Sequence, residues 1–190
     1  MHAQIHSLVM SNLKQYNIPF IGLKQGKHLF EYEIDNTFFD AYGFNEFNNS
    51  SLQVTLVFEK KTTFFELNFE VNGTVNVDCD TSLEPFNQKI NGNLPLVIKF
   101  GQEYNDDNDE MIIIPHEYYE LDVSQFIYEL IILSVPTKKV HPKVLDGTMD
   151  SEALNKLREL EIKKNKSSSN EDITDPRWDK LKSLITEKKT

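Results

Sequence analysis

The feature that most constrains the fold is an alternation of apolar and polar residues that runs from Leu29 to about Leu121. In residues 65–72, written FELNFEVN, large apolar side chains alternate with charged or amide ones. A period of two places successive side chains on opposite faces of a strand, so each such run predicts a strand with one solvent-exposed face. No long helical pattern separates the runs, which favours antiparallel pairing within one sheet.

Two stretches interrupt this alternation. Gly73 lies between two apolar runs and predicts a β-bulge or a turn. Residues 104–110, written YNDDNDE, predict an acidic loop before a short buried strand at 111–114.

The period changes after Leu121. Asp122 is predicted to cap a helix, with Gln125 three residues later as in a capping box, and Pro136 ends the helical pattern. Residues 151–166 predict a marginal, charged helix, followed by a flexible linker at 166–170. We therefore expect an α+β fold, with a mainly antiparallel β-sheet or partly open barrel, one packed helix and a C-terminal helical extension. The predicted division is a domain at 1–145 and a charged extension at 146–190.

Composition narrows the classes of function. The net charge is -10, which argues against indiscriminate binding of nucleic acid but leaves room for a local basic patch. The single cysteine excludes an intrachain disulfide and any zinc site made of several cysteines. The N-terminus lacks a signal-peptide pattern, and no apolar run approaches the roughly 18 residues that span a membrane. The sequence thus predicts a cytoplasmic protein without a membrane partner.

Several short strings occur together in a characteristic order. They are the stretches 17–28 (NIPFIGLKQGKH), 79–85 (CDTSLEP), 122–129 (DVSQFIYE), 133–136 (LSVP) with His141, and 175–181 (DPRWDKL). Together they resemble the YceD family, the large ribosomal RNA subunit accumulation proteins, and the first string is similar to the variant of Bacteroidetes-type bacteria. The resemblance covers roughly Asn17 to Pro142 and the tail. It implies a non-enzymatic role in ribosome biogenesis, namely accumulation of 23S rRNA in the large subunit.

The Cys79 loop, residues Cys79 to Pro85, carries the motif that draws attention to chemistry. Members of this family often have C-x-x-C-L-x-P, but here Ser82 stands where the second cysteine would fall. A dithiol switch needs two thiols and a zinc site needs several ligands, so neither is expected. A turn, in which Asp80 helps to reverse the chain and Pro85 fixes the exit, is the favoured interpretation. A contact surface and a metal site shared with His116 or His141 are the alternatives.

Basic residues form two clusters that are candidates for RNA contact. The first comprises Lys24, Lys27 and His28, and the second comprises Lys138, Lys139, His141 and Lys143. If the fold brings them together, they make one positive patch for phosphate groups. Alternatively, these are ordinary solvated side chains. The aromatic stretch 38–47 suits base stacking or, as we favour, packing against the sheet.

The tail of the chain holds a further candidate site. Arg177 and Trp178 open a predicted short helix, and Trp178 is the only tryptophan, so we expect this segment to dock on the domain or on another molecule. No phosphate-binding loop, dinucleotide fingerprint or nucleophile elbow occurs, so we expect no enzyme activity, cofactor, metal or small-molecule substrate.

The leading functional hypothesis is a ribosome-biogenesis factor that binds large-subunit precursor rRNA or a ribosomal protein. The alternative is an acidic protein-interaction module that chaperones a basic ribosomal protein without touching RNA, since opposite charges speed encounter. A metal-dependent enzyme that uses Cys79 is the third hypothesis.

Overall fold

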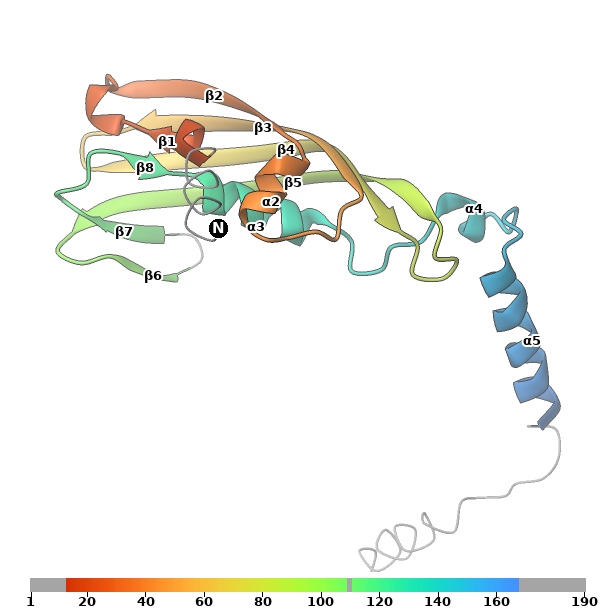
Figure 1. The fold of residues 1–190 in the computed structure, drawn as a ribbon. Coiled ribbons are helices and arrows are strands. Elements are labelled where there is room, and N and C mark those ends of the chain that lie inside the picture. The colour runs from red at the N-terminus through yellow and green to blue at the C-terminus, as the bar shows by residue number, and fades with distance from the viewer. Residues whose placement is uncertain (1–12, 109–110, 168–190) are drawn as a thin grey trace, which may run out of the picture.

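The computed structural model describes residues 13–108 and 111–167, with side chains through residue 160. A six-stranded open sheet dominates it, in the order β2-β3-β4-β5-β7-β6 (Figure 1). The strands are β2 (Gly26–Ile34), β3 (Asn49–Lys60), β4 (Phe64–Asp78), β5 (Pro85–Gly101), β6 (Asn105–Asn108) and β7 (Met111–Pro115). The predicted α+β class with a mainly antiparallel, unclosed sheet is confirmed.

One strand pair departs from the antiparallel expectation. β7 pairs with β5 in parallel, because the chain leaves β5, forms β6 at the outer edge and returns between the two. The predicted acidic loop at 104–110 therefore contains an edge strand, β6, whose four residues are all exposed and whose register is irregular. Charged, irregular strands are common at sheet edges because they discourage pairing with other chains.

The alternation predicted for β3 and β4 is observed in their burial. Val54, Leu56 and Phe58 on β3 are fully buried, as are Phe69 and Val71 on β4. The register continues through Gly73 without a break, so the predicted bulge or turn is wrong. Gly73 has φ +148°, and a Cβ there would collide with the backbone of the neighbouring strand β3, which explains the need for glycine.

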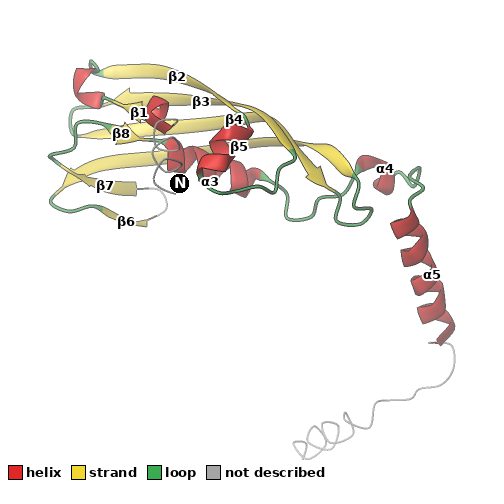
Figure 2. Cartoon of the chain, viewed as in Figure 1, coloured by secondary structure: helices red, strands yellow, loops and turns green. Residues whose placement is uncertain are grey.

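The remaining elements of the domain cover one face of the sheet (Figure 2). They are η1 (Leu13–Tyr16), η2 (Phe20–Gly22), α2 (Asn36–Ala41), α3 (Ser124–Ser134) and a small two-stranded sheet of β1 (Asn17–Ile18) with β8 (Leu121–Asp122). Helix α2 was not predicted. It brings Phe38 and Phe39 into the core, and Phe47 follows it there, which confirms the packing interpretation of the aromatic stretch.

Helix α3 begins one residue later than the sequence predicted. Val123 is at the cap position, and the Asp122 carboxylate still accepts a hydrogen bond from the Ser124 amide at 2.9 Å. Gln125 does not close a capping box, because its amide donates to Glu129 instead. The helix lies close to the sheet at Gly92, where a Cβ would collide with Ser134.

Two helices follow the domain. α4 (Pro142–Leu145) lies at the end of the sheet where β4 passes into β5, and α5 (Glu152–Ser167) extends beyond it (Figure 1). The helix predicted at 151–166 is thus present. The proposed boundary at residue 145 stays a prediction. Within the described residues, no helix combines the length and apolar character needed to cross a membrane.

Candidate functional site

The Cys79 loop is a tight turn that joins β4 to β5. The Cys79 amide donates to the Glu84 carbonyl at 2.9 Å, and the Leu83 amide donates to the Cys79 carbonyl at 2.9 Å. Leu83 adopts φ +60°, a left-handed conformation that is uncommon for a leucine, and its side chain is 72% exposed. The turn interpretation of this motif therefore agrees with the geometry.

The loop is joined to the basic segment, residues 137–143, which follows helix α3. The Asp80 amide donates to the Lys139 carbonyl at 2.8 Å, and the Lys139 amide donates to the Asp80 carboxylate at 2.7 Å. The His141 amide donates to the Cys79 sulfur at 3.3 Å. Two candidate sites some 60 residues apart in the sequence are thus one structural unit, which we call the loop clasp.

The sulfur of Cys79 is fully buried within the clasp and accepts a second amide hydrogen bond, from Ser82 at 3.4 Å. Burial alone raises the pKa of the thiol, but hydrogen bonds from His141, Ser82 and Thr81 outweigh it and lower the pKa from 9.0 to about 7. The sulfur acts as an acceptor that fixes backbone amides. Cys79 can accept these hydrogen bonds with a serine, and not a second cysteine, at position 82.

The imidazole rings of His116 and His141 do not bind the Cys79 sulfur. His141 contributes its backbone amide, while its Nδ1 accepts a hydrogen bond from the Lys143 amide at 3.0 Å and caps α4. His116 stacks on Phe100, near the opposite end of β5. Among the described residues, no group of three or more histidine, cysteine or carboxylate side chains has the arrangement to hold a metal ion.

The clasp presents three lysines on its surface. Lys138 and Lys143 are exposed and Lys139 is half-buried, and none of them forms a salt bridge within the described part of the chain. The backbone of Lys139 is held by Asp80 and that of Lys143 by His141. The segment that carries the lysines is therefore fixed, and Lys138 and Lys143 are accessible on its surface.

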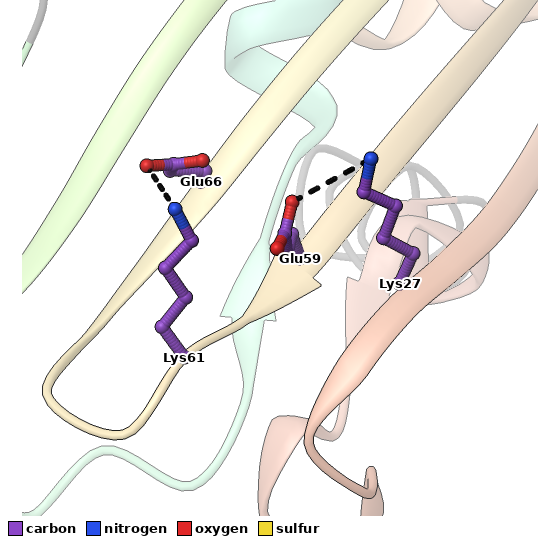
Figure 3. A network of polar contacts seen from close by, with 4 residues as sticks. All are labelled: Lys27, Glu59, Lys61 and Glu66. Carbon is purple, nitrogen blue, oxygen red and sulfur yellow. Dashed lines mark hydrogen bonds and ion pairs between the residues drawn. The ribbon is translucent and has the colours of Figure 1, made fainter.

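The other basic cluster lies at the far end of the sheet, so the condition for one combined patch is not met. In the register of the sheet, Lys27 of β2 lies opposite Glu59 of β3, and Glu59 lies opposite Glu66 of β4. Cys79 follows the opposite end of β4. Thirteen residues of strand separate the two sites by roughly 40 Å. Lys27 also forms a salt bridge with Glu59 at 3.8 Å (Figure 3), and His28 is hydrogen-bonded to the Lys24 carbonyl.

Sequence reasoning missed the clasp itself, because no local pattern signals that Asp80 meets Lys139. The tail candidates Arg177 and Trp178 lie outside the described residues, so their docking stays a prediction.

Comparison with family models matches residues 67–185 to the family described as large ribosomal RNA subunit accumulation protein YceD. The matched range includes the Cys79 loop and the basic segment but not Lys24, Lys27 or His28. No curated protein and no solved structure matches the chain. Because the match covers more than half of the sequence, and as the short strings predicted, the chain belongs to the YceD family, whose name gives it a role in large-subunit rRNA accumulation.

Proposed function

We propose that this protein supports accumulation of large-subunit rRNA by binding the precursor rRNA through the loop clasp. The observation that carries the proposal is that the family's matched region contains a fixed backbone unit that presents Lys138, Lys139 and Lys143. Lysine ammonium groups bind phosphates as point charges, and a fixed backbone loses less entropy on binding than a free loop does.

The charge distribution favours binding through one end of the molecule. The chain carries a net charge of -10, so most of its surface repels RNA, whereas the exposed lysines of the clasp attract it. Such a field orients the encounter so that the clasp faces the RNA. Contact with phosphates positions the protein without reading the base sequence, which suits recognition of a folded precursor by shape.

Binding alone is sufficient for this role. A bound protein stabilises a folded RNA intermediate and shields it from nucleases, and neither effect requires bond-making chemistry. We therefore propose a non-enzymatic function that needs no cofactor.

A second candidate is binding of a basic ribosomal protein, and a specific observation favours it. The open face of the sheet carries the exposed carboxylates of Glu31, Glu33 and Glu70, none of which forms a salt bridge within the described residues. Glu31 and Glu70 flank Thr55 in one cross-strand row. This acidic surface is complementary to the basic surfaces of ribosomal proteins.

Binding measurements with two matched charge variants separate the candidates. The variant K138E/K139E/K143E removes the cations of the clasp, and the variant E31K/E33K/E70K reverses the open face. We expect the first variant to lose affinity for precursor rRNA and the slope of log affinity against log salt to become shallower by about 2. An unchanged RNA affinity in the first variant, together with lost ribosomal-protein binding in the second, would replace the leading proposal with the alternative.

A further inference from the structure

An apolar groove lies between helix α3 and the strands beneath it. Its volume is about 1000 Å³. Its floor is formed by aliphatic and aromatic side chains from β5, β7 and α3: Leu94, Leu96, Ile112, Ile114, Phe126 and Leu130. Leu133 of α3 stands at its rim and is 84% exposed. An apolar groove of this size with an exposed leucine at its edge favours occupation by a peptide segment.

The groove has an acidic border. Four carboxylates line it, and none of them has a salt-bridge partner within the described residues: Asp106, Glu120, Asp122 and Glu129. No lysine, arginine or histidine lines the groove in the described part of the chain. A segment that fills it should therefore carry apolar side chains and few or no acidic ones, because additional carboxylates would be repelled.

The beginning of this chain has that composition. No aspartate or glutamate occurs before Glu31, although the whole chain carries 30 of them. Residues 1–12, which precede the first described residue, include Ile5, Leu8, Val9 and Met10. Residues 175–190 carry three acidic and five basic residues, but helix α5, which precedes them, leads the chain away from the sheet (Figure 1).

The described chain also enters the domain at the rim of the groove. The Tyr16 carbonyl accepts a hydrogen bond from the Val123 amide at 3.1 Å, and Val123 lies next to the groove residue Asp122. Asn17 donates to the groove residue Glu120 at 3.4 Å. Twelve residues reach up to roughly 40 Å, whereas helix α3 is only about 16 Å long. Residues 1–12 can thus follow the groove along its whole length.

We propose that residues 1–12 of the same chain occupy the groove between α3, β5 and β7. The apolar side chains of the segment cover the floor, and its lack of carboxylates suits the acidic rim. This inference is independent of the proposed function, since the groove and the loop clasp share no residue.

Site-specific photo-crosslinking in the full chain tests the proposal. A photoreactive phenylalanine analogue replaces Leu133, and the fold should tolerate it because this side chain is exposed. A second protein carries the analogue at Ile21, which is 67% exposed and similarly close in sequence to residues 1–12 but does not line the groove. After illumination and digestion, mass spectrometry identifies the crosslinked peptides.

The expected result is an intramolecular crosslink from position 133 to residues 1–12 that is several-fold stronger than the crosslink from position 21. The substitution Leu8→Glu should abolish the crosslink from position 133, because it places a carboxylate among apolar and acidic groups. Crosslinks from position 133 to residues 175–190, to a second copy or to no peptide would overturn the proposal. Equal yields from positions 133 and 21 that ignore Leu8→Glu would also overturn it, since they would reflect tethering alone.

Discussion

The substitution Cys79→Ala tests whether the buried sulfur holds the loop clasp together. The sulfur accepts amide hydrogen bonds from His141 at 3.3 Å and Ser82 at 3.4 Å, and its side chain is fully buried. Removing it leaves two amides without their acceptor, at about 1 kcal/mol each, and loses about 1 kcal/mol of packing. The expected loss of unfolding free energy is therefore about 3 kcal/mol.

The dependence of this loss on pH gives a sharper test. The pKa of the Cys79 thiol is lowered in the folded state from 9.0 to about 7, because amide hydrogen bonds outweigh the effect of burial. Between these values the unfolded chain binds more protons than the folded one, so the contribution of the thiol to stability rises with pH. It is fully present above about pH 9 and is lost as pH falls through 7. The full difference is about 2.5 kcal/mol.

Urea denaturation followed by circular dichroism at pH 6, 7.5 and 9 measures both effects. The difference between wild type and Cys79→Ala isolates the thiol from other groups that titrate. Buried tyrosines do not disturb this window, because burial raises the pKa of Tyr32 to about 12 and its contribution is lost only above pH 10. A difference that stays constant from pH 6 to pH 9 would refute the reasoning that the amides stabilise a thiolate.

Two further substitutions test particular positions. The substitution Gly73→Ala should lower the free energy of unfolding by about 3 kcal/mol, because φ is +148° and the new Cβ meets the backbone of β3. The substitution Gly147→Ala, also at positive φ but in open space, should lower it by about 1 kcal/mol. Thermal unfolding measures both changes. Asp80→Ala should increase tryptic cleavage after Lys138 and Lys139, because the carboxylate no longer holds the Lys139 amide. Asp80→Asn keeps an acceptor oxygen and should stay near the wild-type rate, whereas equal rates for all three proteins would contradict the clasp.

The sheet was predictable because its signal is local. The alternation of apolar and polar residues in β3 and β4 specifies which side chains face the core, and the register then follows from the short connection between the two strands. Pairing across longer distances was not predictable. The position of β7 between β5 and β6 depends on which strand edge is most favourable to pair with, and no residue of the 111–115 stretch encodes this choice by itself.

In the candidate site, too, local features were predictable from the sequence and long-range contacts were not. The Cys79 turn and the lysines of the basic segment were each found from local sequence, since turn residues and runs of like charge are recognisable patterns. In their union, Lys139 and His141 take part through backbone groups, and backbone groups leave no mark in a sequence. For the same reason local sequence could not tell whether the N-terminal cluster of Lys24, Lys27 and His28 lies near the clasp, and β4 separates the two.

In-cell ultraviolet crosslinking of the tagged full chain, with identification of the crosslinked peptides and their RNA or protein partners, tests the central claim most directly. The account predicts crosslinks between large-subunit precursor rRNA and residues 79–85 or 137–145, and their loss in K138E/K139E/K143E but not in a K24E/K27E control. Crosslinks to ribosomal proteins through the open sheet face, with no precursor rRNA bound at the loop clasp, would contradict it.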